Sequence, residues 1–423
     1  MARVLKLLGW AGAAALVSGL VGGVASAAPA RPVRNDKLWA AATAALPEQM
    51  KLWQEVVDID SGTGDVEGGR KVAALLIPRL KALGAAVESL PAEAEGLPEN
   101  TVATFSGAGK ARILIIAHID TVFGPGTVAK WPFKVEGAVV HGPGVGDEKG
   151  GVVEALMALK LLHDQGFKGY RKLTLLLETS EERGSPGTRK LINTLVREHD
   201  VELNMEPGDP PDAVTVWRKG SSTFHIIVKG RAAHAGVAPQ DGRNAAVELI
   251  HQLRTVDAMP HSGEGLTANL TTLKAGSRDN IIPDYAEAGV NVRTREAGDL
   301  NKVESALKAS AAATEVPDTT VTVTHEAAYP PLPDNPVTNA LARRAESIYA
   351  ETGRTLGFGG NGGASESAMA AAAGTPALDG LGPVGGGFHS DKEFVDLTTV
   401  TPRLYLLARL IIDLSARPPA PLR

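Results

Sequence analysis

Continuous apolar runs that end in polar, reactive side chains mark the first half of this chain. The run 113–117 (ILIIA) is typical of a strand buried on both faces, and His118 and Asp120 follow it directly. The run 172–177 (KLTLLL) predicts a second buried strand, and it leads into the acidic segment 178–182 (ETSEE). These patterns predict strands whose carboxyl ends carry the chemistry of the protein.

Segments with apolar residues at helical spacing lie around these strands. The first of them contains Pro47, which predicts a break in the helix. Strands that alternate with helices indicate an α/β fold, with a mixed sheet that is covered by helices on both faces. The predicted helices cover 37–60, 68–83, 148–165 and 188–197, and a further short strand ends at 204–206.

The pattern changes near Trp217, where strands and helices follow the order β-α-β-β-α-β. This order is the ferredoxin-like pattern, and it predicts a self-contained α+β domain inserted into the chain. The predicted strands cover 221–228, 266–274, 286–295 and 319–325, and the predicted helices cover 243–254 and 300–313.

A proline-rich segment, 329–336 (YPPLPDNP), predicts a linker back to the α/β domain. The elements expected after it are helices over 337–351 and 401–414, a glycine-rich loop over 357–363 and a helix ending at Ala373. The predicted domains are a signal peptide (1–27), a catalytic domain in two parts (28–218 and 328–423) and the inserted domain (219–327).

Composition limits the classes of function. The chain has 423 residues, of which 43% are hydrophobic and 22% charged, so it has ample material for a core. A net charge of -5 gives no indication of binding to nucleic acid or to an anionic membrane. Aromatic residues make up only 4% of the chain, which argues against a base-stacking surface.

The N-terminus has the pattern of a secretory signal. Arg3 and Lys6 precede an apolar run over 7–24, and Ala25-Ser26-Ala27 fits the small-x-small cleavage rule. We expect cleavage near Ala27 and a secreted or periplasmic bacterial protein with no membrane attachment afterwards. A retained membrane anchor is the alternative interpretation, although glycines interrupt the apolar run.

Five side chains occur where predicted strands or loops end: His118, Asp147, Glu182, Glu206 and His389. The chain has no cysteine, so histidines and carboxylates must hold any metal, and this ligand set suits zinc or a similar divalent ion. A carboxylate is the side chain that bridges two metal ions well, and Asp147 is the candidate bridge.

The neighbouring acidic residues Glu181 and Glu182 need different roles. In an extended segment their side chains point in opposite directions, so both should not bind the same ion. We assign Glu182 to the metal and Glu181 to the base that takes a proton from the attacking water. Asp120 would orient His118 by fixing its tautomer.

Each motif also has a structural interpretation when it is taken alone. His118 and Asp120 can form a hydrogen-bonded structural pair, and an acidic pair such as 181–182 is often a solvated loop. Glu206 can be a turn residue and His389 a capping residue. The coincidence of five such residues at strand and loop ends favours the metal site.

These motifs together resemble the co-catalytic zinc exopeptidase and deacylase family of glutamate carboxypeptidase (carboxypeptidase G type), aminoacylase and succinyl-diaminopimelate desuccinylase. The resemblance covers nearly the whole chain after the signal, and it is greatest to the glutamate carboxypeptidase branch. The motifs are AHIDTV (117–122), GPGVGDEKGG (142–151), TSEERGSPGTR (179–189), MEP (205–207), HAG (234–236), NIIP (280–283) and HSDKEF (389–394).

The resemblance implies two Zn²⁺ per subunit. One zinc would bind His118 and Glu206, and the other would bind Glu182 and His389. Asp147 would bridge them, with Glu181 as the general acid/base. It also implies a cis peptide bond between Asp147 and Glu148.

The resemblance further implies that the inserted domain is a lid and a homodimerisation surface. His234 would reach the active site of the partner subunit and polarise the scissile carbonyl. Asn280 and Arg293 match positions that bind the substrate carboxylate. From the residues alone, His234 can be a plain loop histidine and Arg293 part of a surface salt bridge.

The chain departs from the family pattern at three places. The segment 362–367 (GGASES) stands where the family often has GGGTDA, so Glu366 replaces Asp and Ala364 replaces Gly. No basic residue occurs in 325–331 (HEAAYPP), and Ala213 occupies a position where the glutamate carboxypeptidases have lysine. These departures bring a preference for C-terminal glutamate into question, but they leave hydrolysis itself untouched.

The expected function is therefore hydrolysis of an amide bond next to a free carboxylate in a small molecule or short peptide. A carboxypeptidase that releases C-terminal glutamate is one form of this function. The alternatives are an aminoacylase-like deacylase or dipeptidase, and a non-catalytic exported binding protein on the same fold.

Overall fold

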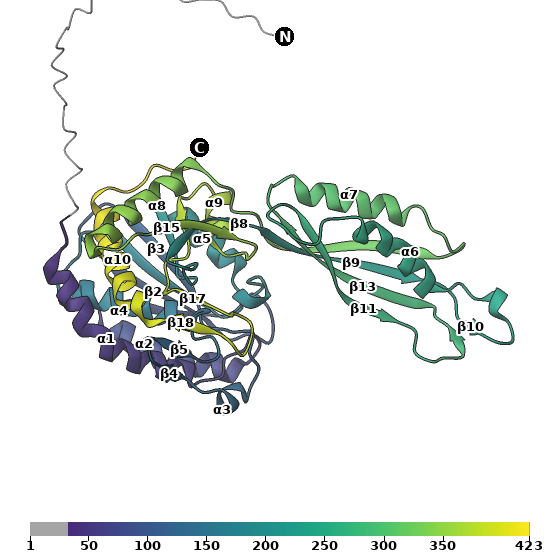
Figure 1. The fold of residues 1–423 in the computed structure, drawn as a ribbon, viewed down its shortest axis with the longest axis horizontal. Coiled ribbons are helices and arrows are strands. Elements are labelled where there is room, and N and C mark those ends of the chain that lie inside the picture. Colours follow the sequence, from purple (N-terminus) through teal and green to yellow (C-terminus); the bar gives the residue numbers. More distant parts are fainter. Residues whose placement is uncertain (1–32, 423) are drawn as a thin grey trace, which may run out of the picture.

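In the computed structural model, which describes residues 33–422, a six-stranded sheet forms the centre of the larger of two units (Figure 1). The first two strand pairs are antiparallel and the remaining pairs are parallel, so the sheet is mixed. In spatial order the strands are β1 (Ala86–Leu90), β2 (Asn100–Ser106), β6 (Lys172–Glu178), β3 (Arg112–His118), β7 (Val201–Asn204) and β16 (Ala377–Leu378).

Helices cover both faces of this sheet, as the alternation of buried residues along β3 requires. Ile113 and Ile115 enter the main core, while Leu114 and Ile116 enter a second core on the opposite face. The main core includes α1 (Asp36–Val57), α2 (Val66–Ala82), α4 (Lys149–Asp164), α8 (Pro336–Tyr349) and α10 (Leu397–Ala416), and the second includes α5 (Arg189–Glu198) and α9 (Ser367–Ala372). The α/β fold with a mixed, doubly covered sheet is confirmed.

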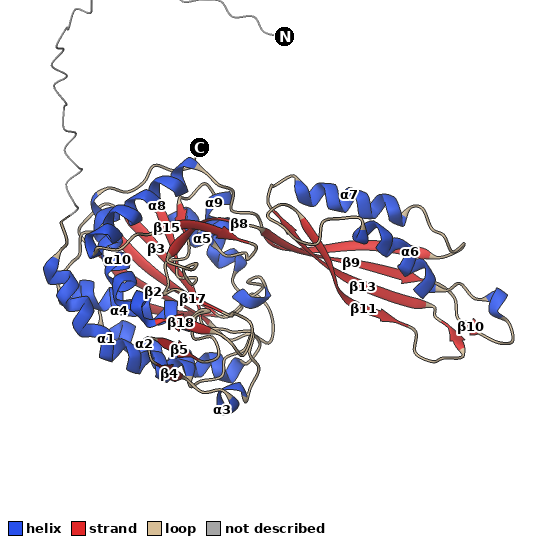
Figure 2. Cartoon of the chain, in the orientation of Figure 1, coloured by secondary structure: helices blue, strands red, loops and turns tan. Residues whose placement is uncertain are grey.

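Two smaller sheets complete the larger unit. A parallel pair, β8 (Ala213–Arg218) and β15 (Gly357–Asn361), lies beside the inserted unit (Figure 2). The other sheet has four short strands in the order β17 (Gly385–Gly386), β18 (Phe394–Asp396), β5 (Val139–His141) and β4 (Lys134–Glu136). This second sheet pairs a segment from the first half of the chain, β5, with a segment near its end, β18, close to the site described below. The short helix α3 (Thr127–Lys130) lies in the loop before it.

Residues 220–329 form the smaller unit, called here the inserted unit, with a sheet and a core of their own. Its four antiparallel strands are ordered β11 (Thr267–Ala275), β13 (Tyr285–Thr294), β9 (Gly220–Lys229) and β14 (Thr320–Tyr329). Helices α6 (Ala245–Asp257) and α7 (Asp299–Ala311) pack on one face of this sheet, over a core that includes Phe224 and Val290. This is the ferredoxin-like arrangement expected from the β-α-β-β-α-β order.

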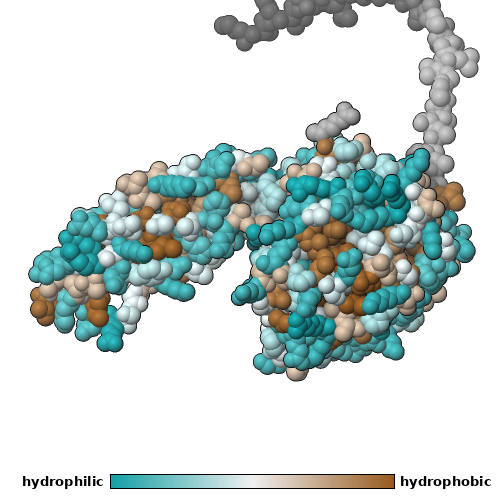
Figure 3. Space-filling model, turned by 180° about the vertical axis from the view of Figure 1, so that it is seen from behind, coloured by the Kyte–Doolittle hydropathy of each residue, from teal (hydrophilic) through white to brown (hydrophobic). Residues whose placement is uncertain are grey.

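A two-stranded extension lies at the far end of the inserted unit. It pairs β10 (Ala233–His234) with β12 (Ile281–Ile282). Figure 1 shows β10 at the end of the inserted sheet that points away from the larger unit. Figure 3 shows the molecule from behind, with the notch where the two units meet.

Two local predictions about these elements are wrong. Helix α1 continues through Pro47. Proline has no N–H, so the Thr43 carbonyl loses its helical partner. Both residues are exposed, so water can hydrogen-bond to that carbonyl. The glycine-rich segment 357–361 is strand β15 rather than a loop. A side chain at Gly360 would collide with the Trp217 ring, so glycine there permits the close pairing with β8.

Strands β1 and β2 were not predicted, although β2 lies in the central sheet between β1 and β6. The predicted signal peptide, 1–27, lies outside the described residues. Among the described residues, no helix is long and apolar enough to cross a membrane.

Candidate active site

His118, the last residue of β3, is oriented by hydrogen bonds on both sides. Its Nδ1 lies 3.0 Å from the carbonyl oxygen of Asp120. A carbonyl only accepts, so Nδ1 carries a proton, and Nε2 is the nitrogen whose lone pair becomes available once its own proton is displaced by a bound cation. Nε2 is 3.1 Å from Oδ1 of Asp147. His118 is thus held in the tautomer that suits a metal ligand, chiefly through the main chain of Asp120 rather than through its carboxylate, which lies 3.5 Å away.

Asp147 lies between the two histidines. Its other oxygen, Oδ2, is 3.2 Å from Nε2 of His389, and Nε2 of His389 is also 3.1 Å from Oε2 of Glu182. His389 has a φ of 62°, in the left-handed region that non-glycine residues rarely occupy. This strained residue belongs to the cluster, and backbone outliers of this kind often mark function.

The remaining carboxylates approach His118 from a different direction. Oε1 of Glu206 lies 3.6 Å and Oε2 of Glu181 lies 4.0 Å from Nε2 of His118. The structure therefore brings together all five candidate metal ligands and the candidate base. The predicted cis peptide bond between Asp147 and Glu148 is also confirmed.

The segment that holds Glu181 and Glu182 is a 3₁₀ turn, Glu181–Arg183, and the expectation of an extended strand is wrong. The Asp120 carboxylate accepts the backbone N–H of Glu181 at 3.1 Å and that of Glu182 at 3.4 Å, and these bonds accompany the tight turn. The two side chains nevertheless diverge, Glu181 toward His118 and Glu182 toward His389.

The donor set fits divalent cations. The site offers imidazole nitrogens and carboxylate oxygens only, which suits zinc. The buried Oε1 of Glu182 has no hydrogen-bond partner among the described residues, so it is available to bind a cation. Burial raises the pKa of Glu206 to about 7, although Arg218 opposes this, and burial also raises the pKa of Glu181 and Glu182. Positive charge placed among these carboxylates would offset the cost of burying them.

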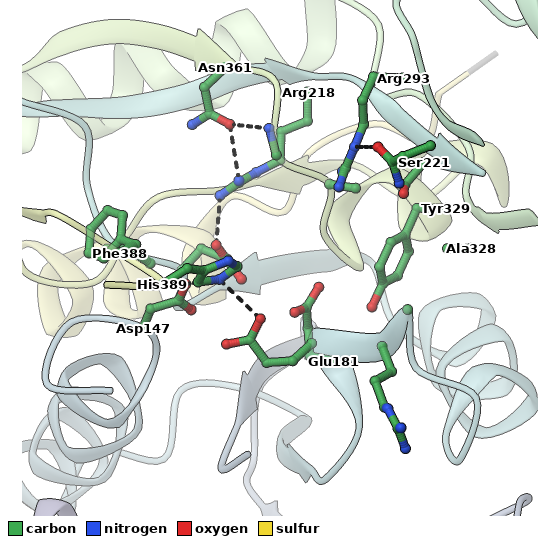
Figure 4. Close-up of a pocket in the computed structure, with 18 of the residues that line it drawn as sticks. Asp147, Glu181, Arg218, Ser221, Arg293, Ala328, Tyr329, Asn361, Phe388 and His389 are labelled. Atoms are coloured by element: carbon green, nitrogen blue, oxygen red, sulfur yellow. Dashed lines mark hydrogen bonds and ion pairs between the residues drawn. The ribbon is translucent and has the colours of Figure 1, made fainter. Parts of the chain in front are cut away.

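A cavity of about 600 Å³ opens from this cluster toward the inserted unit (Figure 4). Asp147, Glu181 and His389 line one wall, and Arg293 of β13 lines the opposite side together with Tyr329. Burial lowers the pKa of the Arg293 guanidinium, and nearby Glu181 raises it. The cavity thus places the acidic cluster opposite a cation that can bind a carboxylate.

His234 and Asn280 do not line this cavity. His234 is exposed in β10, where Nδ1 accepts hydrogen bonds from Gly236 and Val237 at 3.1 Å. The Asn280 carbonyl accepts the N–H of Ala235 at 2.9 Å, so the two residues lie beside each other at the far end of the inserted unit. Within one chain, Arg293 is the only one of the three lid candidates at the cavity among the residues described.

Sequence reasoning assigned no role to three charged residues at the site. Arg218 is buried and contacts Glu206, and Arg183 lines the cavity as an exposed cation. Glu393 accepts the N–H groups of Gly144, Gly146 and Asp147 at 2.8–3.0 Å. For Arg218, the available signal was an arginine at the end of an apolar segment, in 217–220 (WRKG). For Glu393 the sequence offered no signal, because the loop that it bonds to is distant in sequence.

Comparison with known proteins decides the family. The profile of Peptidase family M20/M25/M40 matches residues 114–413. The chain belongs to this family. Carboxypeptidase G2 of Pseudomonas sp. (strain RS-16) is 35% identical over 407 residues, which cover 96% of this chain and 97% of that protein. Succinyl-diaminopimelate desuccinylase of Methylobacterium sp. (strain 4-46) is 30% identical and covers 87% of this chain and 96% of that protein.

Solved structures of M20 peptidases share the fold. Aminopeptidase PepT of Bacillus cereus ATCC 10987 superimposes with a TM-score of 0.70 at 20% identity, covering 87% of this chain and 98% of that chain. An M20 family metallo-carboxypeptidase of Sulfolobus solfataricus also gives a TM-score of 0.70, at 15% identity, with 86% and 98% covered. This M20 peptidase is a metal-dependent hydrolase, and the non-catalytic alternative is set aside.

Proposed function

We propose that this M20 peptidase is a secreted dizinc carboxypeptidase that cleaves an amide bond next to a free carboxylate. One observation carries the proposal. The Asp147 carboxylate lies between the Nε2 atoms of His118 and His389, and Glu181 and Arg293 line the same cavity. A metal centre, a proton acceptor and a carboxylate-binding cation are the three groups that such a hydrolase requires.

The residues divide into two metal positions around Asp147. His118 and Glu206 would hold one Zn²⁺, Glu182 and His389 would hold the other, and each oxygen of Asp147 faces one histidine. Bound zinc supplies Lewis acidity that polarises the scissile carbonyl and makes water more acidic.

Glu181 moves the proton. Its carboxylate accepts a proton from the attacking water as the water oxygen bonds to the carbonyl carbon, and it then gives that proton to the leaving nitrogen as the C–N bond breaks. Its backbone N–H is anchored on Asp120, which fixes the side chain beside His118. Arg293 binds the free carboxylate of the released residue and so orients the amide bond.

The inserted unit is proposed to be both lid and dimerisation domain, with boundaries near 219 and 327. Its edge strand β11 exposes Leu270 and Leu273, and the adjacent helix α6 exposes Val247 and Ile250. An exposed apolar edge strand is suited to pairing with a second copy. In such a dimer, His234 would act at the partner's active site on the substrate carbonyl, and Asn280 would accompany it.

Two candidates for the side chain of the released residue have support. The identity to carboxypeptidase G2 and the exposed, cavity-lining Arg183 favour C-terminal glutamate. The missing basic residues at Ala213 and near Ala328 favour an uncharged side chain, as in an aminoacylase-like deacylase or a dipeptidase. We propose glutamate release first, with Arg183 as the cation for its side chain.

A substrate screen tests the proposal. Zinc-reconstituted enzyme is assayed on N-acyl-glutamate, N-acyl-leucine and simple dipeptides. The control is the same N-acyl-glutamate with its α-carboxylate converted to an amide. Faster hydrolysis of N-acyl-glutamate than of N-acyl-leucine supports the carboxypeptidase proposal, and the reverse order supports the deacylase. Cleavage of the amidated control at the same rate would show that no free carboxylate is required and would contradict the proposed function.

Export is part of the same proposal. It rests on the basic, apolar and small-residue pattern that ends at Ala27. N-terminal sequencing of the mature protein from culture supernatant or periplasm checks it, and a mature chain starting at Ala28 is expected. Protein that keeps residues 1–27 and stays in the cytosol would contradict export without affecting the activity.

A further inference from the structure

Arg218 is a buried cation in direct contact with one of the metal-binding carboxylates. It is the last residue of β8, opposite Asn361 of β15, and only 4% of its surface is exposed. Its Nη2 lies 3.2 Å from Oε2 of Glu206. Figure 4 shows the guanidinium between Asn361 and the acidic cluster.

Most of the hydrogen-bond donors of Arg218 are committed to one orientation. Nε and Nη2 both bond to the Asp379 carboxylate at 2.7 Å, and Nη1 lies 3.4 Å from Oδ1 of Asn361. Asp379 is fully buried and also accepts the Ser365 hydroxyl. A bidentate arginine–aspartate pair has rigid geometry, so the second N–H of Nη2 is aimed at Glu206.

This contact gives the two oxygens of Glu206 separate roles. Oε2 is occupied by Arg218, and Oε1 faces Nε2 of His118 at 3.6 Å. Glu182 is the corresponding carboxylate on the other side of Asp147, and within residues 33–422 it has no arginine partner: Oε2 faces His389 and Oε1 is unpartnered. The two metal positions therefore differ in how their glutamate is held.

We propose that Arg218, fixed by Asp379, is a positioning residue that holds Glu206 as a one-oxygen ligand and so makes the two metal positions unequal. The inference rests on the proposed dizinc function. Outer partners of metal ligands typically contribute about 10- to 100-fold to metal affinity. Loss of the Arg218 contact should lower affinity at the His118–Glu206 position and leave the His389–Glu182 position unchanged.

Zinc titration of two variants tests this inference. Arg218→Lys keeps the charge but cannot bond to Asp379 through two nitrogens and also reach Glu206, and Asp379→Asn loosens the pair without removing the arginine. Competition with a chromogenic chelator should show two tight zinc ions in the unaltered enzyme. In each variant, one of them should bind about 10- to 100-fold more weakly. When Co²⁺ replaces zinc, the absorption of one of the two bound ions should differ between each variant and the unaltered enzyme.

Arg403→Lys is the matched control. Arg403 is another fully buried arginine paired with an aspartate, Asp212, at 2.8 Å. It also donates to the carbonyls of Gly380 and Ala213, but it has no hydrogen bond or ion pair with Glu206, Asp379 or the six cluster residues in the part of the chain described. The control variant should lose thermal stability but keep both zinc affinities. The inference would be overturned if both site variants bound zinc as tightly as the unaltered enzyme, or if Arg403→Lys lost as much zinc affinity as they did. Either result would leave the dizinc proposal intact. An unaltered enzyme that binds no zinc would overturn the proposed function itself.

Discussion

At the scale of single residues, the proposed base Glu181 lies slightly farther from His118 than the proposed metal ligands Asp147 and Glu206 do. Its side chain is buried and lies 4.0 Å from Nε2 of His118. Burial raises its pKa well above the usual value, which suits a group that must both accept and return a proton.

Glu181→Gln should lower kcat by about 10²- to 10⁴-fold, because the amide cannot accept the proton of water. Zinc content should stay unchanged, since Glu181 is not expected to hold the metal. Glu182→Gln is the matched control and should lose zinc as well as activity. Steady-state kinetics with metal analysis checks both variants; near-normal turnover by Glu181→Gln would rule out its role as the base.

His199 provides a pH-dependent contribution to stability away from the site. It is 4% exposed, its Nδ1 donates to the Leu195 carbonyl, and its Nε2 accepts from Thr174. Burial lowers its pKa from 6.5 to about 4. The unfolded chain therefore binds a proton that the native protein does not, and stability falls as pH drops from about 6.5 to about 4.

His199→Gln should reduce this loss of stability at acid pH by up to about 3 kcal/mol. The measurement is the difference in Tm between pH 7 and pH 5. It should be smaller in the variant than in the unaltered protein, while substitution of the exposed His163 should leave it unchanged. An identical difference in all three proteins would show that His199 does not titrate in this way.

At the scale of elements, the loop that carries Asp147 depends on a distant strand. Glu393, next to β18, accepts three backbone N–H groups of this loop, and its carboxylate is fully buried. The means of attachment could not be predicted, because Glu393 and Asp147 are 246 residues apart.

Glu393→Gln should destabilise the loop, since the amide nitrogen of glutamine must face at least one backbone N–H. A buried donor without an acceptor costs about 1–3 kcal/mol. We expect a lower Tm together with weaker zinc retention during dialysis against a chelator. Asp391→Asn, at an exposed neighbouring position, should change neither quantity. Unchanged Tm and zinc content in Glu393→Gln would contradict this role.

Local sequence patterns predicted the elements of the central sheet unevenly. Strands β3 and β6 were predicted because they are continuous apolar runs buried on both faces. Strand β15 was not, since its glycines indicate a loop unless Trp217 of the neighbouring strand is known to lie against them. Pro47 likewise does not break α1, because the exposed side of that helix tolerates the lost hydrogen bond.

At the scale of the whole molecule, the residues of the expected site are divided between two ends of the inserted unit. Arg293 lines the cavity, whereas His234 and Asn280 lie in and beside the β10–β12 extension, at the opposite end. A role for His234 in catalysis thus requires a second copy of the chain. The exposed apolar residues of β11 and α6, Ile250 at 61% and Leu273 at 56% among them, form the surface on which such a copy would pack.

Subunit mixing tests the shared site. Glu181→Gln and His234→Ala should each be nearly inactive alone. In a mixed dimer, the chain with an intact Glu181 would receive an intact His234 from its partner, so random mixing should restore about a quarter of the full activity. The variants are mixed after partial denaturation and refolding, and kcat is measured on the best substrate. No recovery, with mixed dimers present, would contradict the proposed role of His234 across the interface.

By itself the sequence determined the class of fold and the six residues of the acidic and histidine cluster. These properties depend on local hydrophobic pattern, strand ends and side-chain chemistry, which neighbouring residues specify. Only the tertiary structure decided how the cluster is held. Arg218 bonds to Asp379 across 161 residues and Glu393 to Asp147 across 246, and no local pattern encodes such pairs. Their geometry arises when the two parts of the larger unit close around the central sheet.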